Sequence, residues 1–215
     1  MRLAEHHLDE RPDKLDEMTE TPDTRSRVVA AASRLFAMRG FNATSIADVA
    51  AESGLLKGNL AYYFKTKNDL LEAVVEARAK ALWDELVAPG QPGEEARDTI
   101  ARLLVHVRAS ADELAQYGCP VGGLSTELGK TDAALHTNAA GLLLKVEGFL
   151  HEAFARALPN EVAARLAEQL LSRLQGAAVV AQARRDPAVV RRQVDDAEAW
   201  LDTVLPRATK RRRAS

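Results

Sequence analysis

Apolar residues recur at helical spacing from Thr24 onward. The first set falls at i, i+3, i+4, i+7 and i+8, and it comprises Val28, Ala31, Ala32, Leu35 and Phe36. Gly40 predicts the end of this helix, and Phe41 is placed for the hydrophobic contact of a Schellman close. We therefore expect one helix, packed through a single face, over residues 24–39.

The next stretch, TSIADVAAESG, predicts a short helix followed by a tight turn. Ile46 and Val49 begin its apolar face, and Ser45 with Asp48 fits a capping box that defines its N-terminus. Gly54 stands where a turn between two helices needs a residue that tolerates positive φ. This pattern is typical of the first helix and turn of a helix-turn-helix.

The following segment, LLKGNLAYYF, predicts a second short helix with Leu60 and Phe64 on its buried side. Its outward residues suit the major groove of DNA. Lys57 donates to guanine or phosphate, Asn59 pairs with an adenine edge, and Gly58 lets the backbone come close. DNA recognition is the chemistry that this face favours, although amphipathic helix pairs also occur in purely structural bundles.

A second capping box, Thr66 with Asp69, predicts that a further helix begins where Lys67 would hold the DNA backbone. Tyr63 also suits a phosphate. Arg25 and Arg27 are placed to reach phosphates too, or to lie on a solvated helix face.

The stretch ATSIADVAAESGLLKGNLAYYFKTKNDLL resembles the helix-turn-helix of the TetR family of bacterial regulators over residues 25 to 72. Leu56 stands where the family usually has a small polar residue, and it offers an apolar contact to a thymine methyl instead. Ala61 stands where the family often has tyrosine. The residues that the resemblance and the chemistry together assign to DNA binding are Thr44, Ser45, Leu56, Lys57, Gly58, Asn59, Tyr62, Tyr63 and Lys67.

Further helices are predicted down the chain. A linker helix runs from Leu70 to about Leu86, PGQPGEE at 89–95 breaks the chain, and a helix follows from about Glu94 to Tyr117. A later helix begins at Pro159 and Asn160. Its residues 175–183, QGAAVVAQA, have side chains small enough for another helix to approach closely. Asp186 as N-cap and Pro187 open the last helix. Two such helices from each of two subunits would form a four-helix dimer interface.

The segment from Gly118 to Leu128 is similar to a Gly-Cys-x-x-Gly-x-Leu-x-x-Glu-Leu element in the ligand-binding domain of one TetR subgroup. That subgroup includes regulators of multidrug exporters and electrophile-responsive repressors. The resemblance places the element over a pocket with apolar walls and a few polar contacts. The candidate ligand-binding residues are His106, Cys119, Leu124, Glu127, His136, Leu142, Val146 and Phe149.

The charge distribution favours the N-terminal helices as the DNA-binding part. Residues 1–23 carry eight acidic and three basic side chains, whereas residues 24–80 carry nine basic and five acidic ones. Only the second of these segments suits a polyanion. The final ten residues, 206–215, carry five basic groups and no acidic one, and we expect a disordered tail there, with non-specific attraction to DNA as the alternative.

A single cysteine, Cys119, rules out an intrachain disulfide. The N-terminus lacks a secretory apolar core, and no charge-free apolar run reaches the length of a membrane span, so we expect a cytoplasmic protein without membrane contact. His6 and His7 lie in a polar arm, where disorder is a simpler interpretation than metal binding. No metal site and no cofactor are predicted.

These features predict an all-α, homodimeric, ligand-responsive repressor that binds a palindromic operator and is released by a small apolar or amphipathic effector. The expected parts are an arm at 1–23, a three-helix helix-turn-helix domain at 24–69, a ligand-binding and dimerisation domain at 70–205, and a basic tail at 206–215.

Three alternatives stay open at this stage. The chain could be a dimeric helical scaffold without DNA binding, a redox or electrophile sensor acting through Cys119, or a helical enzyme using His106, His136, Glu127 or Cys119. An enzyme is not expected, because no metal-spaced His/Glu motif, glycine-rich phosphate loop or nucleophile elbow occurs.

Overall fold

The computed structural model describes residues 23–87 and 94–205. Three parts of the predicted organisation lie outside the described residues. They are the arm up to residue 22, which includes His6 and His7, most of the predicted break at 89–95, and the basic tail. Within the described ranges every regular element is an α-helix, so the predicted all-α class is confirmed.

The first four helices are α1 (Thr24–Arg39), α2 (Ile46–Ser53), α3 (Lys57–Tyr63) and α4 (Lys67–Val87). The helices after residue 93 are α5 (Ala96–Ala109), α6 (Ala111–Tyr117), α7 (Pro120–Leu128), α8 (Ala133–Ala155), α9 (Asn160–Arg184) and α10 (Ala188–Val204).

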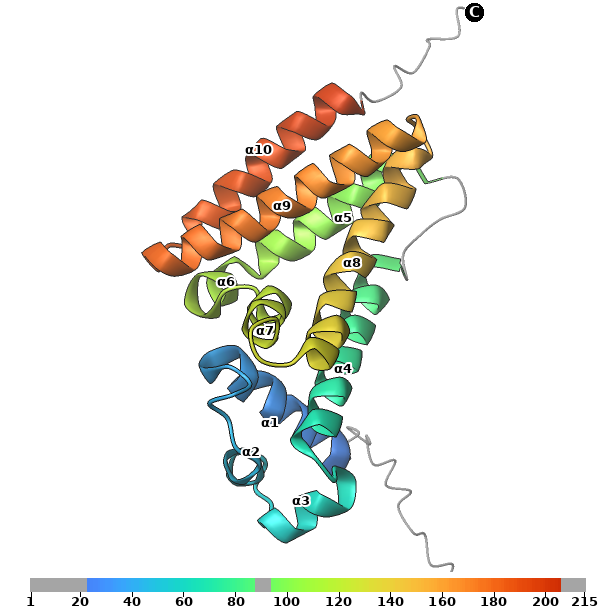
Figure 1. Ribbon diagram of the computed structural model, residues 1–215. Coiled ribbons are helices and arrows are strands. Elements are labelled where there is room, and N and C mark those ends of the chain that lie inside the picture. The colour runs from blue at the N-terminus through green and yellow to red at the C-terminus, as the bar shows by residue number, and fades with distance from the viewer. Residues whose placement is uncertain (1–22, 88–93, 206–215) are drawn as a thin grey trace, which may run out of the picture.

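Figure 1 shows an elongated molecule with α1, α2 and α3 at one end and α5, α9 and α10 at the other. The long helices α4 and α8 run side by side between the two ends and contact each other. In the middle, α7 packs against both α1 and α8, while α6 packs against α9. The short helices α6 and α7 are therefore the elements that stand between the two ends.

Two hydrophobic cores organise these helices. The lower core joins α1, α2, α3 and the first half of α4 to α7 and the first half of α8. The upper core joins α5, α6, α9 and α10 to the second half of α8. Leu82 and Trp83 of α4 pack against both cores. The domain boundary that we predicted between residues 69 and 70 runs through the lower core, because Leu70 and Leu71 are fully buried in it.

The structure divides the helix that the sequence predicts from about Glu94 to Tyr117. Ser110 ends α5 and precedes α6, and its carbonyl accepts from the Leu114 N–H at 2.9 Å. The break turns α6 so that Ala111 and Ala115 are buried, in a helix that packs on α9. A continuous helix was the wrong prediction, because burial of these two alanines against a distant helix leaves no local sequence signal.

The end of α1 also differs from the prediction. Gly40 has φ 85° and ψ 164°, which is not the left-handed conformation of a Schellman close. The expected hydrophobic contact does form, because the Phe36 and Phe41 rings meet edge to face with centroids 5.3 Å apart. The Phe41 N–H, however, donates to a carboxylate oxygen of Glu127 in α7 instead of to a carbonyl of α1.

The last helix begins one residue later than predicted, at Ala188. Asp186 nevertheless caps it, because its carboxylate accepts from the Ala188 N–H at 2.9 Å. The apolar side chains at helical spacing along α10 and at its C-cap are buried: Val190, Val194, Ala197, Leu201 and Leu205.

Candidate nucleic-acid interface and ligand pocket

The helix pair α2–α3 is held by local contacts that the sequence predicts. Ser45 caps α2: its hydroxyl accepts from the Asp48 N–H at 3.1 Å, and the Asp48 carboxylate accepts from the Ser45 N–H at 2.7 Å. Gly54 ends α2 in the left-handed region at φ 71°, as the turn requires. The two helices are thus fixed relative to each other by a defined start and a defined turn.

The side chains of α3 divide sharply between core and surface. Leu60 is fully buried, and Phe64, which ends the helix, is 4% exposed. The opposite face is open: the exposed residues include Lys57, Gly58, Asn59, Tyr62 and Tyr63. A side chain added at Gly58 would meet no atom within 4 Å, so packing inside the protein does not require a glycine there. Close approach of another molecule is a physical reason for it.

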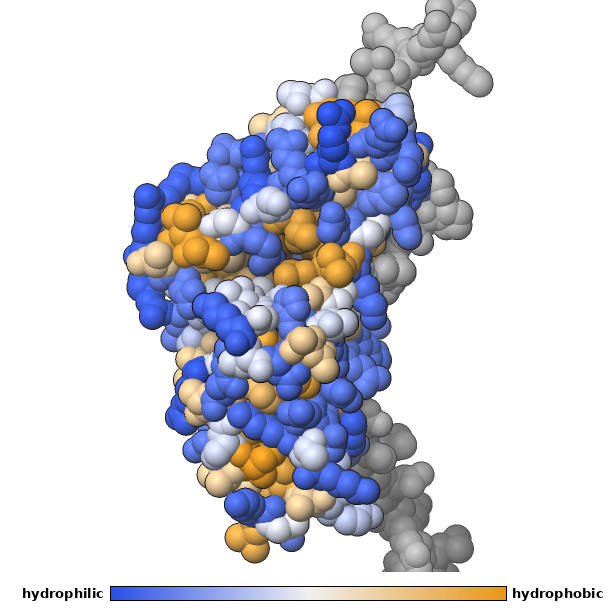
Figure 2. All heavy atoms as spheres, viewed as in Figure 1, coloured by the Kyte–Doolittle hydropathy of each residue, from blue (hydrophilic) through white to orange (hydrophobic). Residues whose placement is uncertain are grey.

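Apolar and aromatic side chains also reach the surface beside this face. Leu56 is 76% exposed and Tyr62 is 86% exposed, and Tyr62 contacts the Tyr63 ring edge to face at 5.3 Å between centroids. Figure 2 shows a hydrophobic spot at the tip of the molecule where α2 and α3 lie. Such exposed groups suit stacking or contact with thymine methyl groups more than solvent.

Thr44 does not belong to this open face. It is 1% exposed, and its hydroxyl donates to the Gly40 carbonyl at 2.8 Å. The Thr44 side chain therefore holds the corner between α1 and α2 and is not exposed on this face, whereas the assignment of Thr44 to DNA binding stays a prediction. Ser45, the next residue, is exposed and stands at the N-terminus of α2.

Lys67, at the start of α4, is half-buried and lies over an aromatic ring. Its ammonium is 4.1 Å from the centroid of Phe41. Partial burial lowers the pKa of Lys67, and the nearby carboxylate of Glu127 opposes that shift. The cation is therefore held in a fixed place beside the α1–α2 corner.

Two arginines near the start of α1 make contacts with neighbouring helices. Arg27 donates to the Ser53 carbonyl at the end of α2 at 2.9 Å, and the Arg25 guanidinium lies 5.2 Å from the Phe64 ring centroid. Both residues are exposed, so the two alternatives for them, contact with phosphates and a solvated helix face, both stay open.

Acid will weaken the starts of α2 and α4. Hydrogen bonds from the Ser45 hydroxyl and N–H lower the pKa of Asp48, and those from Thr66 lower the pKa of Asp69. A lowered folded pKa contributes stability above the unfolded value, near 3.8, and that stability is lost as the pH falls through the folded value.

We expect the Asp48→Asn/Asp69→Asn variant to be less stable than the original chain at pH 7. The difference should shrink as the pH falls below 3.8 and through the lower folded values, because the carboxylates of the original chain are then protonated as well. Urea melts followed by circular dichroism across this range measure it. A difference that stays constant down to pH 2 would contradict the capping role.

The eight candidate ligand-binding residues do not lie together. Leu124 and Leu142 are buried in the lower core, whereas Val146 is buried in the upper core and Phe149 packs against it. His106 bonds to Glu85, with 2.7 Å between Nδ1 and the carboxylate, and His136 lies against Gly129. The remaining two, Cys119 and Glu127, line one open hollow.

This hollow has a volume of about 810 Å³ and lies between α7, α8 and α9. Asn42, from the corner before α2, also lines it, so it touches both ends of the molecule. Its walls mix Leu143 and Val179 with the amides of Gln175 and Gln182. A cavity of this size and mixed lining suits a small amphipathic molecule.

Cys119 has a charged neighbour that the sequence does not reveal. The thiol caps α7 by accepting from the Gly122 N–H at 3.4 Å, and the thiol is half-buried. Arg78 of α4 is close enough for its charge to interact with Cys119 and with Glu113. Burial lowers the pKa of Arg78, and these two groups oppose the shift. Sequence reasoning missed this arginine because it lies on a different helix.

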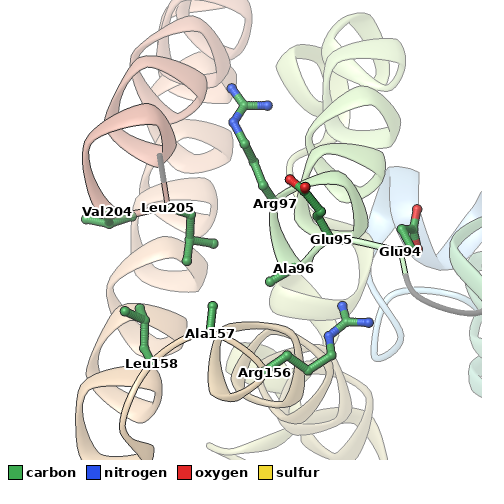
Figure 3. Close-up of a pocket in the computed structure, with 9 residues that line it drawn as sticks. All are labelled: Glu94, Glu95, Ala96, Arg97, Arg156, Ala157, Leu158, Val204 and Leu205. Carbon is green, nitrogen blue, oxygen red and sulfur yellow. The ribbon is translucent and has the colours of Figure 1, made fainter. Parts of the chain in front are cut away.

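A second hollow, of about 430 Å³, lies at the far end between the start of α5, the end of α8 and the end of α10 (Figure 3). Three of the four charged side chains that line it, Glu94, Arg97 and Arg156, have partners. Arg97 pairs with Asp202, and Arg156 donates to the Thr99 hydroxyl at 2.6 Å. This favours structural cohesion over ligand binding at this end.

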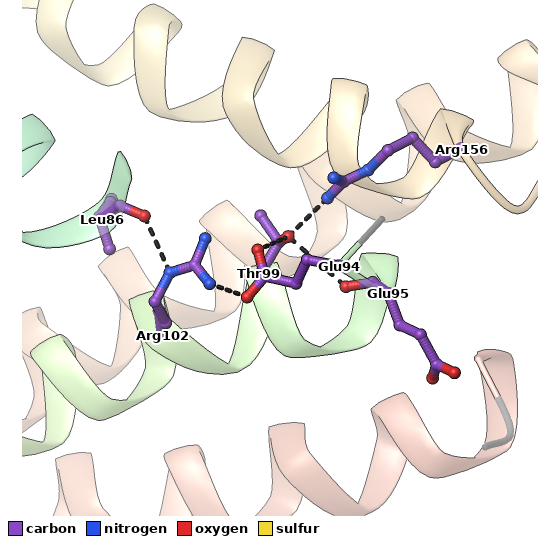
Figure 4. Close-up of polar contacts among 6 residues, drawn as sticks. All are labelled: Leu86, Glu94, Glu95, Thr99, Arg102 and Arg156. Carbon is purple, nitrogen blue, oxygen red and sulfur yellow. Dashed lines mark hydrogen bonds and ion pairs between the residues drawn. The ribbon is translucent and has the colours of Figure 1, made fainter. Parts of the chain in front are cut away.

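The same end contains a polar network that ties three helices (Figure 4). Arg102 of α5 donates to the Leu86 carbonyl of α4 at 2.8 Å and to the Glu94 carboxylate. Thr99 donates to that carboxylate at 3.0 Å and accepts from Arg156 after α8. The hydrogen bond from Arg102 is the main cause that lowers the pKa of Glu94.

Two absences apply to the part of the chain that the structure covers. No helix there is long and apolar enough to cross a membrane. No group of three or more His, Cys, Asp or Glu side chains there is placed to hold a metal ion.

Comparison with protein-family models identifies both halves of the chain. Residues 28–74 match the model described as bacterial regulatory proteins, tetR family. Residues 92–195 match the model described as the C-terminal domain of LmrA/YxaF-like transcriptional regulators.

Curated relatives agree with these matches. The chain is 31% identical over 142 residues to the HTH-type transcriptional regulator BetI of Cronobacter sakazakii. The aligned region covers 64% of this chain and 68% of BetI. It is 25% identical over 178 residues to the uncharacterized HTH-type transcriptional regulator YxaF of Bacillus subtilis, covering 79% of this chain and 90% of YxaF.

Solved structures share the fold. A TetR transcriptional regulator from Legionella pneumophila superposes with a TM-score of 0.72 at 20% identity, covering 83% of this chain and 98% of that one. A TetR transcriptional regulator from Chloroflexus aurantiacus gives a TM-score of 0.70 at 24% identity, covering 83% and 93%.

Proposed function

The chain belongs to the TetR family of DNA-binding transcriptional regulators, a family of regulators and not of enzymes, and from this premise we propose that it is a ligand-responsive repressor. In this proposal a homodimer binds a palindromic operator, and a small amphipathic effector releases it. The observation that carries the proposal is the open face of α3, presented beside the capped start of α2 and beside Lys67.

In the proposed complex α3 enters the major groove. Asn59 and Lys57 contact base edges, Gly58 lets the backbone approach, and Leu56 meets a thymine methyl. Ser45, Tyr63 and Lys67 hold the phosphates, and Tyr62 contributes to the same surface. Because phosphate contacts release counterions, operator affinity should fall steeply as salt rises.

We assign dimerisation to α9 and α10. Val179 is 66% exposed and Val180 is 40% exposed on α9, and Figure 2 shows hydrophobic residues at the surface of the end where α9 and α10 lie. Pairing of these helices between two copies would bury such residues in a four-helix interface. A two-fold pair of α3 helices then reads two half-sites, which explains a palindromic operator.

The hollow between α7, α8 and α9 is our candidate for the effector site. It is lined by Cys119 and Glu127, which the sequence singles out, and by a residue of the α1–α2 corner, Asn42. An effector that binds the released form more tightly than the operator-bound form lowers the affinity of the protein for the operator. The operator then lowers the affinity for the effector by the same factor.

The experiment that tests the function is selection of genomic fragments by the purified protein, followed by gel shifts over a range of salt. A regulator binds a palindromic fragment with steep salt dependence. A dimeric scaffold, the rival function, binds no fragment at any salt concentration.

Two substitutions separate the proposed roles on DNA. Lys67→Ala should weaken binding to all sequences alike and lower the salt slope by about 1. Asn59→Ala should cost about 1–3 kcal/mol at the preferred base and relax the preference there. Binding curves for operator variants measure both. Equal losses for both substitutions on every operator variant would show that Asn59 does not read a base.

A thiol sensor is the second candidate, because Cys119 lines the hollow, caps α7 and lies near Arg78. Alkylation of Cys119 would then release the operator, and alkylation without change in operator binding would exclude this candidate.

A further inference from the structure

The carboxylate of Glu127 joins the two ends of the molecule. From the last turn of α7, its two oxygens accept from successive backbone N–H groups, of Phe41 at 2.9 Å and of Asn42 at 2.7 Å. Both amides belong to the corner between α1 and α2. Hydrogen bonds to a carboxylate are shorter and stronger than those between neutral groups, and a pair of them fixes direction as well as distance.

The corner is shaped to receive this carboxylate. A Cβ added at Gly40 would lie 2.8 Å from one Glu127 oxygen, so glycine is required for the approach. Gly40 also has φ 85°, a conformation that other residues rarely adopt. The glycine, the two amides and Glu127 together form what we call the corner clamp.

The corner clamp lies directly behind the DNA-facing groups. Phe41, which donates to Glu127, carries the Lys67 ammonium on its ring, and Thr44 closes the corner by bonding to the Gly40 carbonyl. Ser45, the exposed cap of α2, follows at once. A change in the orientation of the α1–α2 corner relative to α7 would therefore move Ser45 and Lys67 together.

The lower core also joins α7 and α8 to α1 and α4, through apolar side chains. The hydrophobic driving force is non-directional, whereas the two hydrogen bonds to Glu127 add a directional contact between α7 and the corner. Asn42 and Glu127 also both line the 810 Å³ hollow, so a molecule bound there touches both sides of the clamp.

We propose that Glu127 is a positioning residue that fixes the angle of the DNA-binding end on the rest of the chain, and thereby the spacing of the two α3 helices in the dimer. This rests on the proposed function as an operator-binding dimer. Contact with DNA is not part of the role: Glu127 acts through the backbone of Phe41 and Asn42.

The first test needs no DNA. Hydrogen exchange at the Phe41 and Asn42 amides, followed by NMR, should accelerate about tenfold or more in Glu127→Ala. In Glu127→Gln one acceptor oxygen remains, so the acceleration should be smaller. Glu152→Ala, which removes an exposed carboxylate from α8, is the matched control and should change neither amide. Unchanged exchange at both amides in Glu127→Ala would overturn the clamp.

The second test compares operators whose half-sites lie one base pair closer together or farther apart than in the selected operator. The original dimer and Glu152→Ala should prefer one spacing by about tenfold, whereas Glu127→Ala should bind all three within about twofold. A purely structural role would weaken binding to all three by the same factor, and that result overturns the proposal. Thermal melts confirm that each variant is folded.

The two tests keep the proposals apart. If the original protein binds no DNA, the proposed function fails and hydrogen exchange alone decides whether the clamp exists. If the original protein binds its operator but Glu127→Ala keeps the same spacing preference, the function stands and the positioning role is wrong.

Discussion

Leu60→Ala will strongly weaken operator binding while leaving the upper core folded. Leu60 is fully buried beneath the exposed face of α3, in a helix of only seven residues. Truncating such a leucine costs about 2–5 kcal/mol. The start of α3 has no side-chain cap, because Leu56 stands at its N-cap, so the helix depends on this anchor. Since about 1.4 kcal/mol corresponds to a factor of ten, we expect a loss in affinity of at least about thirtyfold.

Gel shifts measure the affinity, and size-exclusion chromatography with circular dichroism establishes that the rest of the chain remains folded. Leu144→Ala is the matched control, because this leucine of α8 is 64% exposed, lies outside the DNA-facing helices, and its removal should alter stability by less than about 0.5 kcal/mol. Wild-type affinity in Leu60→Ala would show that α3 is positioned by something other than its buried face.

Phe154→Ala will have the largest effect on global stability. Phe154 is fully buried at the end of α8, and its ring meets Trp200 of α10 edge to face at 6.0 Å between centroids. Its loss costs about 3–5 kcal/mol, a large part of the 5–15 kcal/mol that typically stabilises a protein. In a chain of this size about 1 kcal/mol corresponds to about 2–4 °C, so Tm should fall by roughly 6–20 °C.

Scanning calorimetry measures this change. Phe154→Leu, which keeps most of the volume, should cost much less, while Leu144→Ala on the exposed side of α8 should change Tm little. If the alanine and leucine variants at position 154 melted at the temperature of the original chain, the ring would not hold α8 against α10.

The DNA-binding end could be predicted from the sequence because its determinants are local. Ser45 and Asp48 are three residues apart, Thr66 and Asp69 are three residues apart, and both pairs form the hydrogen bonds of a capping box. The turn at Gly54 lies between them. Short-range hydrogen bonds and one glycine are sufficient to specify α2 and the start of α4.

Contacts between distant segments could not be predicted. Glu127 and Phe41 are 86 positions apart, and a carboxylate that binds backbone amides leaves no complementary side chain to recognise in the sequence. Arg78 and Cys119 are 41 positions apart and lie on different helices, so only the folded chain brings their charges close enough to interact. The burial of Thr44 could not be predicted for a different reason: next to a helix cap, a threonine hydroxyl serves equally well toward solvent or toward a carbonyl.

The lower core determines where a chimera that joins the DNA-binding helices of this chain to a relative can be cut. A fusion cut after Asp69 would transplant α1, α2 and α3 but abandon the apolar surfaces that Leu70, Leu71 and Val74 present to them. A functional graft must carry α4 as far as Trp83, together with the matching faces of α7 and α8. A DNA-binding end of this type can therefore be exchanged between proteins only together with the long helix that packs on it.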